Sequence, residues 1–339
     1  MKEGFAMAGK LLCLSPLPVA TLRFLLNLSP GIGDTQIITV DDMNDDDVAK
    51  AFASADVVLG DFTFKHRIGP DLVAKAGPIK LIQQPSVGYE HIDIKACSSR
   101  RIPVANTPGS NSVSVAEHTI AFGLAMLRKL IPANRSVREG QWVQTALQPF
   151  ELQHKTWGIV GLGQIGRHVA LRLKPFALSK VLYYDVYQAP RQVEVQCGVE
   201  YCDLQTLLIS SDIVSLHAPA TDANRNMIGA DQLSLMKSDA YLINVARGSL
   251  VDEAALAQAL RDGVIGGAAI DVFPQEPPSA VDPLLKVDEN KLLLSPHIAG
   301  VSSESAQRIM IMAMENVGRA LRGEPPLYVI NPQTLGVPT

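Results

Sequence analysis

Residues 157–166 read WGIVGLGQIG, and an apolar strand candidate at their start runs directly into Gly161, Gly163 and Gly166. The first glycine allows a sharp turn off the strand, the second leaves room for a pyrophosphate to approach the backbone, and the third lets the next helix pack closely. That helix directs free backbone N–H groups and its positive dipole end at the phosphates. The stretch therefore predicts a dinucleotide-binding turn.

An acidic residue follows the glycines at the spacing that ribose recognition requires. The apolar run at residues 181–184 ends in Asp185, nineteen residues after Gly166. A carboxylate there accepts hydrogen bonds from the adenosine ribose hydroxyls and repels a 2′-phosphate. The pattern favours NAD over NADP. Two alternatives stay open: Arg191 lies just beyond and could meet a phosphate, and Asp185 could be a helix cap or turn residue.

The composition is that of a soluble globular protein whose partners are small molecules. The chain has 339 residues, 47% hydrophobic and 19% charged, enough for two domains with sizeable cores. A formal net charge of −4 without a polybasic run excludes nucleic acid and an anionic membrane as expected partners. The apolar segment at residues 11–28 is interrupted too often by proline and polar residues to span a bilayer or to form a signal peptide.

The four cysteines are scattered without a C-x-x-C pair or a neighbouring histidine cluster. This spacing predicts neither a metal site nor a disulfide framework. We therefore expect reduced thiols in a cytoplasmic protein.

Short apolar runs alternate with helix-like stretches, as in parallel sheets that carry helices on both faces. The pattern restarts at the glycine turn, so we expect an α/β fold with two doubly wound parallel-sheet domains. The expected strands lie at residues 11–14, 36–40, 56–59, 79–82, 157–160, 181–184, 213–216, 241–244, 268–270 and 292–294.

Two helices suggest how these domains are connected. Ser114 and Glu117 fit a capping box that opens a long helix towards Leu130. Apolar residues repeat at helical spacing between 310 and 321, and we expect this last helix to return to the first domain. The predicted substrate domain is therefore discontinuous, with residues 1–107 and 301–339, and the predicted cofactor domain comprises residues 108–300.

Three polar segments follow apolar strands in the second half of the chain, where open parallel sheets bind ligands. Arg247 could hold a carboxylate by two hydrogen bonds, or could be a solvated surface residue. Asp271 and Glu276 share a proline-rich segment, and His297 follows the last strand. A lone histidine there is usually structural. A carboxylate beside it would raise its pKa towards neutrality, which suits a general acid and base for a carbonyl/alcohol pair.

Four motifs in this order resemble the family of NAD-dependent D-isomer-specific 2-hydroxyacid dehydrogenases. They are the glycine turn, VARG around Arg247, DVFPQEP around Glu276 and PHIAG around His297, and SVGYEHID at 86–93 and NSVSVAEH at 111–118 extend the match. The resemblance implies a Rossmann NAD-binding domain inserted in a flavodoxin-like catalytic domain. It also implies interconversion of a small 2-oxo acid and its D-2-hydroxy acid, with glyoxylate or hydroxypyruvate as the leading substrates.

The resemblance implies roles for individual residues. In the family the arginine of the VARG-like motif, here Arg247, binds the substrate carboxylate and polarises the carbonyl. The histidine of PHIAG, here His297, exchanges the proton, and the glutamate of DVFPQEP, here Glu276, hydrogen-bonds that histidine. Backbone N–H groups around Val87 and Gly88 help to hold the carboxylate.

The resemblance also implies the cofactor contacts and the assembly. Beside the three glycines, the implied contacts are Gln164 and Ile165 at the pyrophosphate, Asp185 at the ribose, Ala218, Pro219 and Asn224 along the nucleotide, Val245 and Ala246 on the nicotinamide side, and Asp271 at the carboxamide. Arg247 and His297 are implied around the ring, and Gly300 is a further implied cofactor contact. A homodimer through the NAD-binding domain is implied, with the long helix and residues 137–142 as candidate contacts.

Two other functions remain open on the sequence. Formate dehydrogenases, and phosphite-type enzymes, are similar in layout, and residues 109–118 lean towards the formate branch, but that branch carries a glutamine where this chain has Glu276. Corepressors of the same fold use an NAD site to control protein assembly and retain a similar triad. Turnover of a 2-oxo acid would separate these functions.

Overall fold

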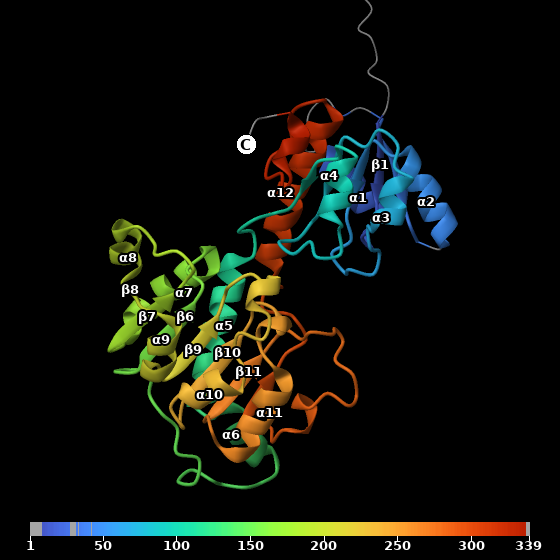
Figure 1. Ribbon diagram of the computed structural model, residues 1–339. Helices are drawn as coiled ribbons and strands as arrows, with labels where there is room; N and C mark the ends of the chain where they lie inside the picture. The colour runs from blue at the N-terminus through green and yellow to red at the C-terminus, as the bar shows by residue number, and fades with distance from the viewer. Residues whose placement is uncertain (1–8, 28–31, 33, 42, 337–339) are drawn as a thin grey trace, which may run out of the picture. The chain divides into compact units, whose positions relative to one another are not determined.

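The computed structural model describes residues 9–27, 32, 34–41 and 43–336, and the chain divides into two compact units (Figure 1). The first unit comprises residues 1–111 and 302–339, and the second comprises residues 112–301. Leu28, the last residue of the apolar segment discussed above, lies outside the described residues.

The first unit is built on a parallel five-stranded sheet in the order β2-β1-β3-β4-β5, which is the flavodoxin-like order. Its strands are β1 (Lys10–Cys13), β2 (Gln36–Thr39), β3 (Val57–Leu59), β4 (Leu81–Gln83) and β5 (Val104–Ala105). Its helices are α1 (Val19–Asn27), α2 (Asp45–Ser54), α3 (Pro70–Ala74), α4 (Ile94–Ser99), α12 (Ser303–Leu321) and the 3₁₀ helix η5 (Pro332–Leu335).

Alternation along the strands gives this sheet two packed faces. Leu12 of β1 packs with Phe52 of α2, whereas Leu11 packs with α1 and with Val317 of α12. Successive residues of a strand point to opposite faces, so each strand contributes to both cores. The last long helix therefore packs on the sheet of the first unit, far from it in sequence (Figure 1).

The second unit contains a parallel seven-stranded sheet in the order β12-β11-β10-β9-β6-β7-β8. Its strands are β6 (Thr156–Val160), β7 (Lys180–Tyr184), β8 (Glu200–Tyr201), β9 (Ile213–Leu216), β10 (Tyr241–Asn244), β11 (Gly267–Ile270) and β12 (Leu292–Leu294). Its helices are α5 (Ser112–Leu127), α6 (Leu130–Arg138), α7 (Gln164–Leu173), α8 (Arg191–Cys197), α9 (Leu204–Ser210), α10 (Ala230–Leu235), α11 (Glu253–Asp262) and the 3₁₀ helices η1 (Lys174–Phe176), η2 (Asp222–Asn224), η3 (Gly248–Leu250) and η4 (Leu284–Lys286).

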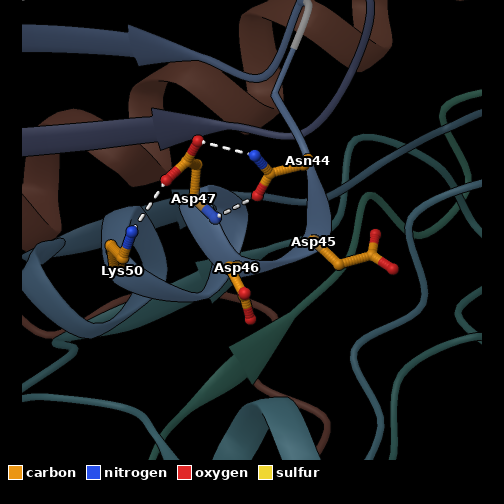
Figure 2. Close-up of a pocket in the computed structure, with 5 residues that line it drawn as sticks. All are labelled: Asn44, Asp45, Asp46, Asp47 and Lys50. Carbon is orange, nitrogen blue, oxygen red and sulfur yellow. Dashed lines mark hydrogen bonds and ion pairs between the residues drawn. The ribbon is translucent and has the colours of Figure 1, made fainter.

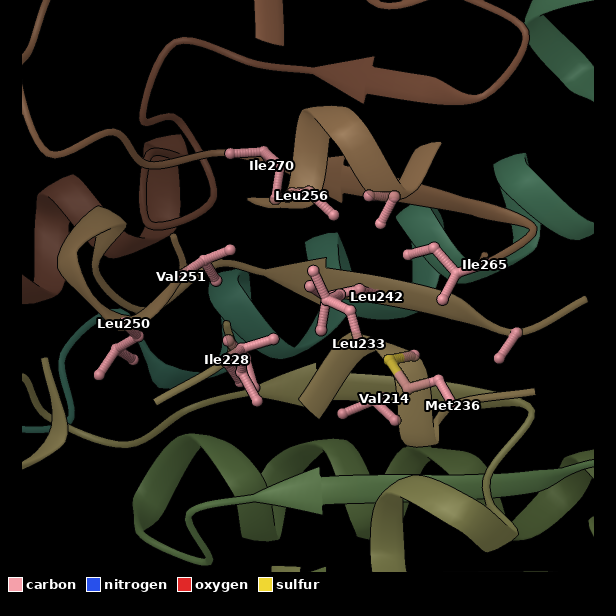
Figure 3. Packing of buried hydrophobic residues seen from close by; sticks show 14 of the residues in the cluster. Val214, Ile228, Leu233, Met236, Leu242, Leu250, Val251, Leu256, Ile265 and Ile270 are labelled. Atoms are coloured by element: carbon pink, nitrogen blue, oxygen red, sulfur yellow. The ribbon is translucent and has the colours of Figure 1, made fainter. Parts of the chain in front are cut away.

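Helices cover both faces of this sheet. Helices α9, α10 and α11 pack on one face in an aliphatic core that includes Leu233, Leu242 and Leu256 (Figure 3). Helices α5 and α7 pack on the other face around Trp157 and Ile243. The strand order reverses between β6 and β9, the place where Rossmann sheets bind dinucleotides. The predicted fold class, with two doubly wound parallel-sheet domains, is confirmed.

The predicted start of the long helix is wrong. Helix α5 begins at Ser112, so Ser114 and Glu117 lie inside it and do not form a capping box at its first turn. The chain enters α5 through a turn with Gly109 at φ 78°, where the Ser110 hydroxyl donates to the carbonyl of Thr107. This turn sets the helix start. Near the other end, Lys129 adopts a left-handed conformation, so α5 ends at Leu127 and α6 begins separately.

The described part of the chain shows neither a membrane-spanning helix nor a metal-binding cluster. No helix there is long and apolar enough to cross a membrane, and no group of three or more His, Cys, Asp and Glu side chains there could hold a metal ion. A hollow lies over the first turn of α2, where Asp47 pairs with Lys50 and accepts from Asn44 (Figure 2). None of its residues is a predicted site residue.

Candidate active site

The three glycines occupy positions at the β6–α7 turn that suit a dinucleotide. Gly161 has φ +97°, and an added Cβ would lie 2.7 Å from the backbone nitrogen of Ala218. At Gly166 a Cβ would lie 2.2 Å from the carbonyl oxygen of Gly161, so only glycine lets α7 approach the strand. A Cβ at Gly163 would meet nothing within 4 Å. The turn is therefore closed by backbone at two glycines and open at the third, where a phosphate would approach the N-terminus of α7.

Substitution of Gly163 and Gly166 should separate cofactor binding from folding. We expect Gly163→Val to keep the melting temperature close to wild type, because its side chain enters open space, and to weaken NADH binding more than about tenfold, or about 1.4 kcal/mol. Gly166→Ala should instead destabilise the protein, because its methyl group overlaps Gly161. Thermal unfolding and NADH fluorescence titration measure both effects, and tight NADH binding by Gly163→Val would contradict this assignment.

Asp185 connects the end of β7 to the glycine turn. One of its carboxylate oxygens accepts from the backbone N–H of Leu162 at 2.8 Å, and the other accepts from the N–H of Val186 at 2.8 Å. Each oxygen keeps a further lone pair for a ligand hydroxyl. Arg191, the potential phosphate contact, forms an ion pair with Glu194 at 3.2 Å. The negative charge at this end of the sheet is thus supplied by Asp185, held in place by the turn itself.

The segment after β9 lies beside the glycine turn. Ala218 contacts Gly161, as described above, and the side-chain amide of Asn224 donates to the carbonyl of Pro219 at 2.8 Å. The carbonyl oxygen of Asn224's side chain accepts from the backbone of Thr221 at 2.7 Å. Asn224 therefore closes the loop that begins at Pro219, which gives it a structural role whether or not it contacts a nucleotide.

A buried asparagine shapes the turn that carries Arg247. The side chain of Asn244 donates to the carbonyl of Arg247 at 2.9 Å and accepts from the N–H of Ala246 at 3.1 Å. Val245 and Ala246 are buried between them, and the guanidinium donates to the carbonyl of Ala246 at 2.7 Å. Asn244 is not among the predicted site residues, although a polar residue at the end of an apolar strand is a usable signal.

Glu276 and His297 form the central pair of the site. Nδ1 of His297 lies 2.7 Å from Oε2 of Glu276, and Oε1 of Glu276 accepts from the N–H of Phe273 at 3.0 Å. Arg247 lies close enough to act electrostatically on both side chains. The structure thus brings together the three residues that the sequence predicted as catalytic. Because Nδ1 faces Glu276, the remaining ring nitrogen, Nε2, is the atom available for proton exchange.

The electrostatic balance of the pair favours a charged imidazole. The hydrogen bond that His297 donates to Glu276 raises the pKa of His297 above its usual value, against the opposing effect of burial. Burial acts to raise the pKa of Glu276, but the hydrogen bonds from His297 and the Phe273 N–H, with the positive charges of His297 and Arg247, outweigh it and lower the pKa. The pair therefore keeps the proton on the histidine to higher pH than an isolated imidazole would.

Glu276→Gln should move the pH profile more than the maximal rate. Loss of the carboxylate lowers the pKa of His297, so the protonated form persists over a narrower range. Reduction needs the protonated histidine, so we expect the fall of kcat/KM for 2-oxo acid reduction at alkaline pH to begin at lower pH. Oxidation needs the neutral histidine, so we expect the fall of kcat/KM for oxidation at acidic pH also to move to lower pH. Steady-state profiles in both directions provide the measurement, with Glu276→Asp as the charge-retaining control. An unmoved limb would show that Glu276 does not set the protonation of His297.

Asp271 holds the loop on which His297 lies. Its carboxylate is fully buried and accepts from the N–H groups of Ile298 and Ala299, each at 2.9 Å, and from the Ser295 hydroxyl. The structure therefore gives this carboxylate three protein donors. The carboxamide contact that the resemblance implies stays a prediction, and Gly300 ends the same loop.

The predicted carboxylate-binding residues lie in the first unit. The carbonyl of Val87 accepts from the side chain of Asn106 at 2.8 Å, and the carbonyl of Gly88 accepts from the Ser86 hydroxyl at 2.6 Å. These bonds hold the turn after β4, the expected place for the N–H groups that would meet a carboxylate. The role of Val87 and Gly88 stays a prediction.

A family model described as D-isomer specific 2-hydroxyacid dehydrogenase, NAD binding domain, matches residues 120–299, which is more than half of the chain. The chain belongs to this family. The predicted family and class of enzyme, a D-2-hydroxyacid dehydrogenase, are therefore confirmed, and the dehydrogenase contains an NAD-binding domain.

Individual relatives agree with this assignment. The dehydrogenase is 42% identical over 275 residues to a glyoxylate reductase of Thermofilum pendens, with 80% of each chain covered. It is 39% identical over 265 residues to a D-3-phosphoglycerate dehydrogenase of Archaeoglobus fulgidus, covering 78% of this chain and only 50% of that protein. The chain thus spans about half the length of that relative.

Solved structures share this fold over nearly the whole chain. One is an acyclic imino acid reductase, Bsp5, in complex with NADPH and D-Arg, with a TM-score of 0.81, 28% sequence identity and coverage of 95% of this chain and 99% of that chain. That complex contains NADPH, so likeness to known structures does not distinguish NAD from NADP.

Proposed function

We propose that this dehydrogenase interconverts a small 2-oxo acid and its D-2-hydroxy acid with NAD(H), and that glyoxylate or hydroxypyruvate is its substrate. The observation that carries the proposal is the 2.7 Å hydrogen bond between Glu276 and His297, within the electrostatic reach of Arg247. The relative named glyoxylate reductase, 42% identical, supports the choice of substrate. The acidic partner of His297 favours a hydroxy acid over formate, because formate oxidation releases no alcohol proton.

The chain's own residues would bind the substrate, stabilise the developing charge and transfer the proton. A bound nicotinamide cofactor supplies or accepts the hydride. Arg247 binds the carboxylate of the 2-oxo acid and stabilises the charge that develops on the carbonyl oxygen. His297 donates the proton from Nε2 to that oxygen. Until this transfer, the hydrogen bond with Glu276 stabilises the charged imidazole and fixes its ring orientation. In the oxidative direction the neutral imidazole takes the proton back.

The geometry of the cofactor site favours NAD. Asp185 is held by the glycine turn at the end of β7, and its negative charge would repel a 2′-phosphate. The nearby Arg191 is paired with Glu194. We therefore infer a higher kcat/KM with NADH than with NADPH.

We also infer a homodimer that forms through the second unit. Large apolar side chains are exposed on α6 and just after it, including Val137 at 61% and Trp142 at 82%. Clustered exposed apolar residues are typical of protein–protein interfaces. A monomeric mass by analytical ultracentrifugation at micromolar concentration would contradict this inference.

A panel of acids tests the proposed function directly. Glyoxylate, hydroxypyruvate, pyruvate and phosphohydroxypyruvate should be assayed for reduction with NADH and with NADPH, beside formate and phosphite for oxidation with NAD. We expect reduction of glyoxylate or hydroxypyruvate with NADH and a D-configured product wherever a stereocentre forms. Oxidation of formate or phosphite without reduction of any 2-oxo acid would overturn the proposal.

A further inference from the structure

Three polar side chains inside the second unit connect helix α5 to the loop that carries His297. Nε2 of His118, on α5, lies 3.3 Å from Oγ of Ser295, although the two residues are 177 positions apart in sequence. The Ser295 hydroxyl in turn donates a hydrogen bond to Oδ1 of Asp271. Nε2 of His118 is also 4.0 Å from that oxygen. None of these contacts is used in the proton transfer proposed above.

The direction of each hydrogen bond follows from the chemistry of the groups. A buried carboxylate only accepts, so the Ser295 hydroxyl must donate its proton to Asp271. The oxygen of that hydroxyl is then left to accept a hydrogen bond, and His118 can supply one when Nε2 carries the proton. Burial lowers the pKa of His118, against the raising effect of the Asp271 charge, so the neutral ring is favoured. Phe122 packs against the imidazole with ring centroids 4.3 Å apart and restricts its orientation.

Residues 295–299, the loop that carries His297, contain a backbone conformation that is rare for a residue with a side chain. His297 has φ +54°, a left-handed conformation that non-glycine residues rarely adopt. Its N–H donates to the carbonyl of Asp271 at 2.8 Å, while the Asp271 carboxylate accepts from Ile298 and Ala299. Such conformations persist where the surroundings fix them. Asp271 thus holds the backbone N–H groups of His297 and of the two residues after it, while its carboxylate accepts from Ser295, which His118 contacts in turn.

We propose that His118 is a positioning residue for His297. Its Nε2–H, acting through the Ser295 hydroxyl and the Asp271 carboxylate, holds residues 295–299 in the conformation that keeps the His297 imidazole against Glu276. The inference rests on the proposed function in one respect, the assignment of His297 as the proton donor. A small displacement of a catalytic group costs up to about a hundredfold in rate, so the contribution of His118 is measurable although it touches no reacting atom.

The test compares His118→Leu, which removes the donor, with His118→Gln, whose amide N–H can replace it. For His118→Leu we expect kcat for glyoxylate or hydroxypyruvate reduction to fall about tenfold or more, with KM and the Kd for NADH within about twofold of wild type. His118→Gln should recover to within about threefold of the wild-type kcat. The matched control is His168→Leu. His168 is another partly buried histidine of the second unit, and its ring contacts Arg172 instead of this loop, so we expect wild-type kcat.

A second readout does not depend on turnover. The imidazole Cε1–H signal of His297, assigned by its loss in His297→Ala, can be titrated by NMR in the cofactor-free protein. We expect its titration to move to lower pH in His118→Leu, because a loosened loop weakens the contact with Glu276, and to return in His118→Gln. A merely structural role of His118 would lower the melting temperature and leave this titration unchanged. If wild type reduced no 2-oxo acid, the proposed function would fail, while the titration would still test the link from His118 to His297.

Ser295→Ala keeps the inference testable if His118→Leu does not fold. It removes the hydroxyl between His118 and Asp271, so we expect the same loss of kcat and the same shift in the titration as for His118→Leu. The double variant His118→Gln/Ser295→Ala should be no worse than Ser295→Ala, because His118 acts through that hydroxyl. Wild-type kcat and an unchanged His297 titration in Ser295→Ala or His118→Leu would overturn the inference. Equal defects in His118→Leu and His118→Gln would do the same, since they would assign the effect to ring packing on Phe122.

Discussion

Replacement of His297 by alanine is expected to lower kcat for 2-oxo acid reduction by about 10²–10⁴-fold, the usual contribution of a general acid. Glu276, at 2.7 Å from Nδ1, stabilises the protonated imidazole that donates the proton. Without the imidazole, water must act as the acid. Substrate binding should change less than kcat, because the carboxylate is held by Arg247. Steady-state kinetics near neutral pH provide the measurement.

The fold should survive this change. The His297 side chain is 40% exposed, and the loop is held mainly by backbone contacts to Asp271. Circular dichroism and NADH binding by the alanine variant should therefore match wild type, and His297→Gln serves as a variant that keeps a polar side chain but cannot act as an acid. Near-wild-type kcat in both variants would show that the proton follows another path.

Arg247→Ala is expected to lower kcat by about 10²–10³-fold, as when a single donor to a developing oxyanion is removed, and to raise the KM for the 2-oxo acid as well. The guanidinium is assigned both to the carboxylate and to the carbonyl oxygen, so ground-state and transition-state binding are lost together. The effect on kcat/KM should therefore exceed the effect on kcat. Initial rates over a range of substrate concentrations separate the two parameters.

Arg247→Lys is the control for charge without the planar fork. A lysine keeps the positive charge but cannot bind a carboxylate through two parallel hydrogen bonds, so most of the defect should remain. The affinity for NADH should be close to wild type in both variants, because the pyrophosphate is assigned to the glycine turn. Full activity of Arg247→Lys would show that charge alone is required, and full activity of Arg247→Ala would remove Arg247 from the proposed mechanism.

The predictable part of this protein consists of features that depend on residues close together in sequence. The ten apolar runs predicted as strands all correspond to strands of the structure, with differences of at most two residues at their ends, and of the strands that the structure describes only the two-residue β5 and β8 were not predicted. The glycine turn was predictable because φ +97° at Gly161 and the overlap at Gly166 follow from the geometry of a few neighbouring residues. The start of α5 was not. Ser114 and Glu117 match a capping pattern, but the preceding turn, with Gly109 and Ser110, had already begun the helix at Ser112.

By itself, then, the sequence determined the fold class and the location of the glycine turn, and it selected Arg247, Glu276 and His297 as the candidate catalytic residues, because strand periodicity and short motifs are local properties of the chain. The tertiary structure alone decided which atoms meet. Glu276 forms a hydrogen bond with Nδ1 of His297, and the Asp271 carboxylate accepts hydrogen bonds from the loop after β12. His118 contacts Ser295, which is 177 positions away in sequence. Hydrogen-bond partners of this kind depend on how α5, β11 and β12 pack, and no local pattern records that packing.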